Sequence, residues 1–201
     1  WGLPADDFPS IAALDSSLFS RIRAVVLKEM IGNVQFAVCT DELRVNLQGV
    51  FIEKEYVAED SKSDFKTMVR MVATDGHRLS MSKMNLREQE RENGEDLRIP
   101  EKGVIIPRKG FQEVRKLLDG DGEFVSIGID KEKCIVKTEW NATLTVSLID
   151  GTFPDYRRAI HEPSEQDTVI RCDKYALLHG LRRMGVIAPE SVSLTISENL
   201  L

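Results

Sequence analysis

The run Thr74-Asp75-Gly76-His77-Arg78 gathers a carboxylate, an imidazole and a guanidinium in one short stretch of chain. A carboxylate beside an imidazole can serve as a general base with its orienting partner, or as two ligands of a metal ion. A metal site needs further ligands, and His161 and His179 have no ligand spacing to this run. The sequence also lacks Glu-x-x-His, Cys-x-x-Cys, a glycine-rich phosphate loop and a Gly-x-Ser-x-Gly elbow. A metal-dependent hydrolase using Asp75 and His77 is therefore not favoured, and no catalytic residue, metal site or cofactor is predicted.

A hairpin turn with solvated polar side chains is the simplest interpretation of the same run. Glycine accepts the positive φ of a primed hairpin turn, and Asp75 tolerates it. The flanking segments MVRMVA and RLSMSKM alternate in polarity, as paired antiparallel strands do. The segment LIDGTFPDYRR at 148–158 has a similar order: an apolar strand, a turn and then two arginines.

The composition is typical of a globular protein with one or two domains. The 201 residues are 42% hydrophobic and 30% charged. No apolar run approaches the roughly 18 residues of a membrane helix, and the N-terminus lacks the layout of a secretory signal. Three separated cysteines predict buried thiols in a reducing cytoplasm. The net charge of -6 does not exclude nucleic-acid binding, because the placement of the cations matters more than their sum.

A unit of strand, amphipathic helix and further strands recurs along the chain. The first copy has strands at 18–22, 44–53, 67–74 and 78–84, with a helix at 23–38. The second has strands at 103–106, 123–129, 134–138 and 142–148, with a helix at 107–118. The third has strands at 168–171 and 192–196, with a helix at 173–184. The charged, aperiodic segments 55–64 and 85–100 read as loops. Two copies side by side predict an α+β fold with helices on one side and strands on the other.

The helices are expected to bury one face each. The first places Leu27, Met30, Ile31 and Val34 at helical spacing. The second sets cations and Gln112 opposite an apolar side of Phe111, Val114, Leu117 and Leu118. The third opposes His179, Arg182 and Arg183 to Leu177, Leu178, Leu181 and Met184, with Asp173 as N-cap. A basic helix face is commonly just solvated, but on an acidic protein two such faces are candidates for binding phosphates without sequence recognition.

These motifs together resemble the bacterial sliding clamps, the β subunits of DNA polymerase III. That family carries TDGHR in one strand pair and DG-x-FPDYRR at the exit of its middle domain. The segments VQFAV at 34–38, RVNLQGV at 44–50 and VIIPRK at 104–109 support the resemblance in the same order. It implies a DNA-clamp fold, with helices on an inner face and antiparallel sheets on an outer face. The implied domains are 1–15, the tail of clamp domain 1; 16–162, a complete middle domain; and 163–201, the start of domain 3.

The resemblance also implies a function without catalysis. Such a ring encircles duplex DNA without sequence specificity and raises the processivity of the replicative polymerase. Its expected partners are duplex DNA, the polymerase III catalytic subunit, the clamp loader, other polymerases and repair proteins, which bind through short linear peptides. The full-length protein would be a homodimer closed head to tail, and the 201-residue chain alone is not expected to close a ring. The alternative is a stand-alone α+β module that binds nucleic acid or peptides and forms no ring.

The family's functional positions fall on two sets of residues. The implied partner-peptide pocket comprises Leu47, Thr74, Gly76, His77, Arg78, Leu79, Pro154, Arg158 and Ala159. The implied DNA-facing residues are Arg44, Arg108, Lys109, Arg115, Lys116, Arg182 and Arg183. The family often has a larger aliphatic residue in place of Ala159 and an aromatic in place of Asn46. Both differences are expected to change the depth of the pocket.

Overall fold

The computed structural model describes residues 15–58, 65–85, 98–120, 122–160, 164, 170–188 and 191–195. The chain divides into two compact units, the first ending at Ala159 and the second starting at Ile160. Residues 1–14, most of the expected tail of clamp domain 1, lie outside the described residues, and the expected domain limits stay a prediction.

The first unit contains two helices and eight strands among its described residues. The strands are β1 (Phe19–Arg23), β2 (Gly49–Ala58), β3 (Phe65–Thr74), β4 (Leu79–Asn85), β5 (Val104–Pro107), β6 (Phe124–Ile129), β7 (Lys133–Thr138) and β8 (Thr143–Ser147). The helices are α1 (Ala24–Val34) and α2 (Arg108–Leu117), and short 3-10 turns include η2 (Ser16–Leu18), η3 (Gln35–Ala37), η4 (Val45–Leu47) and η6 (Tyr156–Ala159).

Most predicted elements of this unit are confirmed, with two differences at their ends. The helix expected at 23–38 stops at Val34, where η3 tightens the chain into a 3-10 turn. The strand expected at 44–53 starts only at Gly49, because η4 occupies its first residues, and it continues to Ala58. The predicted loop at 55–64 therefore begins as strand, and its remainder lies outside the described residues.

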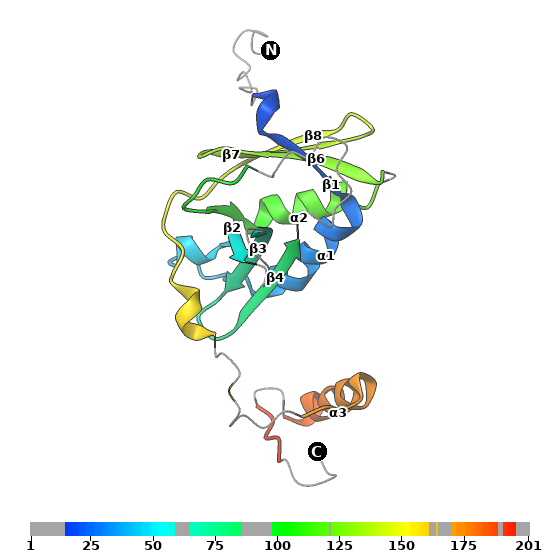
Figure 1. Ribbon diagram of the computed structural model, residues 1–201. Coiled ribbons are helices and arrows are strands. Elements are labelled where there is room, and N and C mark those ends of the chain that lie inside the picture. The colour runs from blue at the N-terminus through cyan, green and yellow to red at the C-terminus, as the bar shows by residue number, and fades with distance from the viewer. Residues whose placement is uncertain are drawn as a thin grey trace, which may run out of the picture. The chain divides into compact units, whose positions relative to one another are not determined.

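The strands form two antiparallel sheets of four, in the orders β1-β6-β7-β8 and β4-β3-β2-β5. Each sheet takes one edge strand from the other repeat, since β1 pairs with β6 and β5 pairs with β2. The structure adds a detail that the repeat pattern did not predict: the two repeats exchange their first strands. Helices α1 and α2 contact each other and pack against the sheets (Figure 1).

The apolar sides of both helices enter one core. Leu27, Ile31 and Val34 of α1 are buried, as are Phe111 and Val114 of α2. They join apolar residues of both sheets in a single cluster. Full burial of such a side chain contributes about 1.5–3 kcal/mol, so the faces of both helices are fixed. The predicted apolar stripes of α1 and α2 are confirmed, and the cations of α2 are consequently turned outward.

Gly103 is required where the chain enters β5. Its φ is +69°, and a Cβ there would collide with the Phe51 ring and lie 2.8 Å from the carbonyl oxygen of Ile52. We expect Gly103→Ala to destabilise the protein by about 2 kcal/mol, because left-handed backbone alone costs about 1–2 kcal/mol per residue. Gly32→Ala in α1, with nothing within 4 Å of the new Cβ, should stabilise it by about 0.5–1 kcal/mol. Urea unfolding of both variants measures this, and shifts of the same sign would contradict it.

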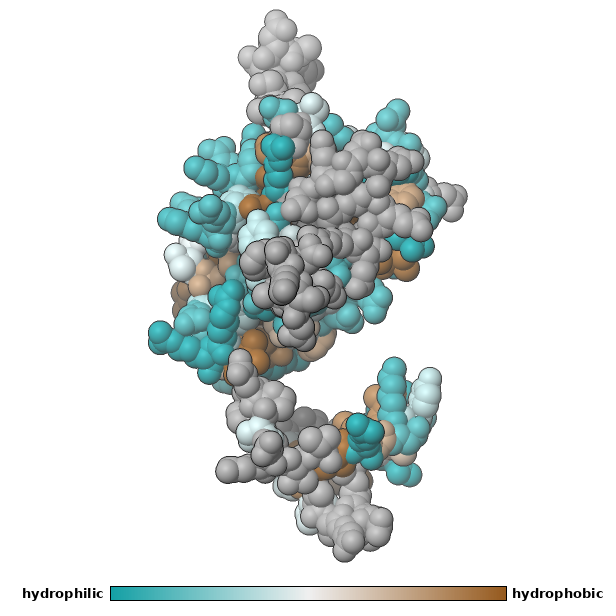
Figure 2. Space-filling view, viewed as in Figure 1, coloured by the Kyte–Doolittle hydropathy of each residue, from teal (hydrophilic) through white to brown (hydrophobic). Residues whose placement is uncertain are grey.

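The second unit contains α3 (Lys174–Ile187) in its described part. The predicted N-cap is confirmed, since Asp173 Oδ1 accepts the Ala176 N–H at 2.7 Å. The apolar face expected to turn inward is only partly covered: Leu177 and Leu178 are half-buried, but Leu181 and Met184 are exposed. Figure 2 shows apolar and polar side chains next to each other over α3. The strand expected at 192–196 is not found over its described residues 192–195, and residues 170–171 of the strand expected at 168–171 are not strand either. Residues 168–169 and 196 lie outside the described residues.

The cysteines differ in their environments. Cys39 and Cys134 are buried, as predicted, and burial raises the pKa of the Cys134 thiol to about 12. The prediction is wrong for Cys172, which is exposed. None of the helices in the described part of the chain is long and apolar enough to cross a membrane.

Candidate functional site

The hairpin between β3 and β4 is held by the carboxylate of Asp75. Its Oδ1 accepts the backbone N–H groups of His77 and Arg78, both at 3.0 Å, and its Oδ2 accepts Arg78 Nε at 3.0 Å. The backbone hydrogen bonds from His77 and Arg78 lower the pKa of Asp75. Thr74 pairs with Leu79, and only Gly76 has positive φ, +89°. The turn is therefore a four-residue loop capped by Asp75, with the expected positive φ at its glycine.

This geometry gives no support to an Asp75–His77 base or metal pair. The carboxylate accepts the backbone N–H of His77, and the imidazole is exposed. Among the described residues, no three His, Cys, Asp or Glu side chains gather where they could hold a metal ion.

The η4 turn links the hairpin to the segment that follows β8. Arg44 Nη1 donates to the carbonyl oxygen of Asp75 at 3.1 Å. Asn46 Nδ2 donates to the carbonyl oxygen of Thr152 at 3.1 Å. The three segments that carry the expected peptide pocket are thus tied to one another, although they lie far apart in the sequence.

The expected pocket residues differ in exposure and in freedom to bind. Leu47 and Leu79 are half-buried, while Pro154, Arg158 and Ala159 on or beside η6 are exposed. Exposed His77 and Arg78 stand at the hairpin tip with Gly76. The Thr74 hydroxyl donates to the Arg78 carbonyl oxygen at 2.7 Å and accepts the Gly76 N–H at 3.1 Å. Thr74 therefore stabilises the turn, and its place in the expected peptide pocket stays a prediction.

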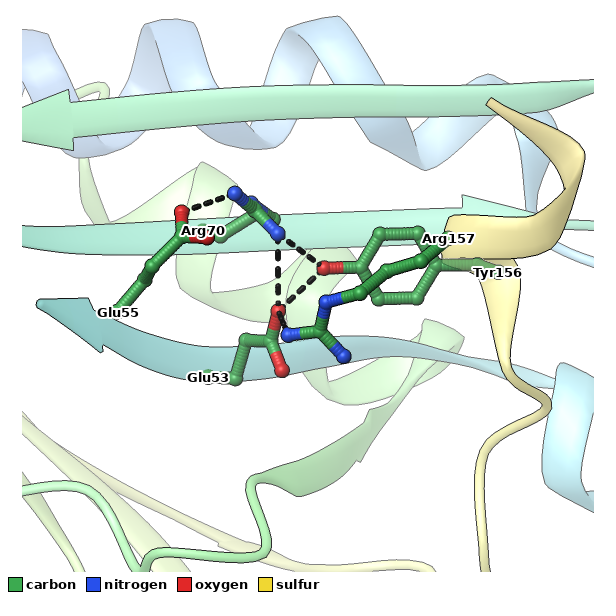
Figure 3. Close-up of polar contacts among 5 residues, drawn as sticks. All are labelled: Glu53, Glu55, Arg70, Tyr156 and Arg157. Atoms are coloured by element: carbon green, nitrogen blue, oxygen red, sulfur yellow. Dashed lines mark hydrogen bonds and ion pairs between the residues drawn. The ribbon is translucent and has the colours of Figure 1, made fainter. Parts of the chain in front are cut away.

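A buried polar cluster, absent from the sequence-based prediction, holds η6 against the sheet (Figure 3). We call it the Tyr156 cluster; its members are Glu53, Glu55, Arg70, Tyr156 and Arg157. Tyr156 OH donates to Glu53 Oε1 and accepts from Arg70 Nη1 at 2.6 Å. Arg70 also donates to Glu55, and Arg157 Nη2 donates to Glu53 Oε1 at 2.7 Å. Burial, together with the hydrogen bond to Glu53, raises the pKa of Tyr156, so its hydroxyl remains a donor.

One sequence signal pointed toward this cluster. Arg70 is a charged residue within the apolar stretch MVRMVA of β3, and Glu53 of β2 lies directly opposite it. A charge inside an apolar strand indicates a buried partner, because charges are rarely fully buried unpaired. The pairing register needed to recognise that partner comes only from the structure.

A cationic cavity of about 470 Å³ lies between the hairpin, η3, the segment 38–44 and the two helices. Four guanidinium groups line it, from Arg44, Arg78, Arg108 and Arg115, together with Phe36, His77, Asp41 and Asp75. Arg78 pairs with Asp75 at 3.0 Å and Arg44 with Asp41 at 3.5 Å. Neither Arg108 nor Arg115 has an ion-pair partner within 4 Å in the described part of the chain, although Arg115 lies near enough to Asp119 to help Lys28 lower the pKa of that carboxylate. The cavity therefore carries an excess of positive charge.

The other expected DNA-facing residues are also on the surface. Lys109 and Lys116 are exposed on α2, and Lys116 pairs with Glu113 at 2.9 Å. Arg182 and Arg183 are exposed on α3 of the second unit.

Comparison with known proteins places this arrangement in a family. Residues 21–155 match the family described as "DNA polymerase III beta subunit, central domain". The match includes the hairpin, η4 and α2. The chain belongs to the DNA polymerase III beta subunit family. The α+β clamp fold expected from the sequence is confirmed by solved structures of this family.

Beta sliding clamps are similar to the chain over almost all of its length. The beta sliding clamp of Proteus mirabilis is 33% identical over 191 residues, 94% of this chain and 46% of that protein. The solved pol III beta of Caulobacter crescentus has a TM-score of 0.72 at 33% identity, covering 93% of this chain and 46% of that one. A clamp from Bartonella birtlesii bound to griselimycin has a TM-score of 0.62 at 34% identity, covering 79% and 39%. The chain thus spans about half the length of the curated relatives it matches.

Proposed function

We propose that the chain is part of a sliding clamp, a ring that surrounds duplex DNA without reading its sequence and tethers the replicative polymerase. The observation that carries the proposal is the two-sided α2 helix of a beta subunit family member. Phe111 and Val114 are buried in the core, while Arg108 and Arg115 are exposed and have no ion-pair partner in the described part of the chain. Unpaired surface cations favour binding to phosphates, which supplies affinity without sequence information.

We further propose that partners bind through short linear peptides at the hairpin, η4 and η6. Half-buried Leu47 and Leu79 offer an apolar floor for leucine or phenylalanine anchors, and His77, Arg78 and Arg158 offer donors to an extended peptide. Two relatives support a ligand site in the family. The Bartonella birtlesii clamp binds griselimycin, and the Caulobacter crescentus clamp binds polyethylene glycol at a region proposed to tether a beta motif.

The proposed role is mechanical and uses no catalytic residue, metal or cofactor of this chain. The proposed partners are the polymerase III catalytic subunit, the clamp loader, other polymerases and repair proteins in the bacterial cytoplasm. The complete protein would act as a homodimeric ring. The alternative, a stand-alone binding module, has no observation in its favour.

Titration of the chain with duplex DNA tests the first part of this proposal. We expect equal affinity, within about twofold, for two 30-base-pair duplexes of unrelated sequence, because phosphate contacts carry no sequence information. The logarithm of the binding constant should fall linearly with the logarithm of salt concentration, with a slope of about -0.9 per phosphate contact. Fluorescence anisotropy between 25 and about 200 mM salt measures both. A strong preference for one duplex, or affinity insensitive to salt, would contradict the proposal.

A further inference from the structure

The Tyr156 cluster balances four charges around one hydroxyl group; Arg70, Glu53 and Glu55 are buried or partly buried, and Arg157 is exposed. Arg70 and Arg157 supply two positive charges, and Glu53 and Glu55 supply two negative ones. The exposed fraction is only 5% for Arg70, 8% for Glu53 and 3% for Tyr156. Removing one partner of such a set leaves another without compensation, which is strongly unfavourable. The cluster therefore pairs each of its four charges, although the buried Arg70 Nε has no hydrogen-bond partner in the described part of the chain.

Aromatic packing gives the same segment a second attachment. The rings of Phe51 and Phe153 stack with centroids 5.0 Å apart and planes 7° from parallel. The Tyr156 ring lies 6.4 Å from both. Phe153 and Tyr156 are both buried, so the chain is held to the outer face of β2 at two points three residues apart.

These attachments hold residues that the proposed function assigns to the peptide pocket. Pro154 lies between the two attachment points, and Arg158 and Ala159 complete η6 directly after Tyr156 and Arg157. All three are exposed, so none of them fixes its own position by burial. Arg70 lies on β3, the strand that ends at Thr74 and enters the hairpin. Strand β3 thus positions both the hairpin, which follows it, and the η6 segment, which Arg70 holds.

We propose that the Tyr156 cluster is the device that orders 154–159 for partner-peptide binding, with Tyr156 as its central positioning residue. The inference rests on the proposed peptide site. A segment that is ordered before binding avoids the conformational entropy that a loose segment loses when the peptide docks. Loosening the cluster should therefore weaken peptide binding even though no member of the cluster need touch the peptide.

The decisive variant is Tyr156→Phe, which keeps the ring and removes only the hydroxyl. Its matched control is Tyr56→Phe, the same chemical change on an exposed residue of β2. We expect Tyr156→Phe to bind a fluorescein-labelled decapeptide with leucine and phenylalanine anchors about tenfold more weakly, the scale expected when a short segment must be ordered on binding. The control should stay within about twofold of the unmodified chain, and duplex DNA affinity should be unchanged in both.

Hydrogen exchange separates positioning from general loss of stability. In Tyr156→Phe, amides at 153–159 should exchange faster while those of α1 keep their protection. Arg157→Gln, at a half-exposed side chain, is a second variant that loosens the same cluster and is expected to act in the same direction should Tyr156→Phe fail to fold.

Three outcomes would decide the matter. Weaker peptide binding with faster exchange at 153–159 and normal DNA binding supports the positioning role. Unchanged peptide affinity in the folded variants overturns that role and leaves the proposed peptide site intact. An unmodified chain that binds DNA but no peptide at millimolar concentration overturns the peptide site, and the positioning role with it.

Discussion

Replacing Leu79 with aspartate is expected to weaken peptide binding at least about 100-fold, close to abolishing it. Leu79 is half-buried at the start of β4, beside the hairpin tip and paired with Thr74. Apolar anchors of a peptide would have to desolvate the new carboxylate without giving it a partner, which is costly. The unmodified chain should bind such a peptide with a dissociation constant of about 1 μM or weaker, roughly -8 kcal/mol. Loss of about 2.7 kcal/mol then moves binding beyond the reach of an anisotropy titration.

Two further variants test whether the loss of peptide binding is specific to the pocket. Val25→Asp adds the same charge to an exposed position of α1 and should bind peptide normally. Ala159→Asp places a charge on exposed η6 with no risk to the core, and should reproduce the loss seen for Leu79→Asp. Circular dichroism shows whether each variant is folded. If folded Leu79→Asp and Ala159→Asp both bind like the unmodified chain, the pocket lies elsewhere.

The sequence predicted the elements of the first unit well, because their hydrophobic periodicity is strong and local. The stripe of Leu27, Ile31 and Val34 specifies one buried helix face whatever the rest of the chain does. Strand exchange between the repeats could not be predicted in the same way. Whether β1 pairs with β6 or with a strand of its own repeat depends on contacts between residues about 100 positions apart, and no local pattern encodes that choice.

The candidate site was predictable as a set of residues but not as a set of contacts. The residues of the hairpin, η4 and η6 were recognised by their resemblance to a family. The hydrogen bonds that tie them, from Arg44 to Asp75 and from Asn46 to Thr152, involve backbone carbonyl groups, and these carry no sequence signature. The Tyr156 cluster was missed for a related reason. Arg70 interrupts an apolar stretch of β3, but its buried partner Glu53 is recognised only once the sheet register places the two opposite each other.

Reversing two charges on α2 should remove most DNA binding without unfolding the protein. Arg115 and Lys116 are exposed, opposite the buried side chains of Phe111 and Val114. At 0.1 M salt, each phosphate contact raises the logarithm of the binding constant by about 0.9 relative to its value at 1 M salt. Loss of two contacts in Arg115→Glu/Lys116→Glu therefore predicts a decrease of about 60-fold, and repulsion by the new carboxylates adds to it. The salt slope should become shallower by about 1.8.

Net charge alone does not explain such a decrease, and a matched variant shows this. Lys83→Glu/Lys131→Glu makes the same change in net charge at exposed positions on β4 and in the turn after β6. If phosphates bind against α2, the control variant should lose affinity only through long-range repulsion. Salt screens that repulsion within about 10 Å at 0.1 M. The salt slope of the control should therefore stay close to that of the unmodified chain. Arg115 lines the cationic cavity, whereas the ion pair with Glu113 already offsets Lys116. The single variant Arg115→Glu should therefore lose at least the share of one contact, a decrease of about 8-fold. Equal losses of DNA affinity in the α2 and control variants would mean that DNA responds to the summed charge of the chain. The proposal that α2 lies on the inner face would then be wrong.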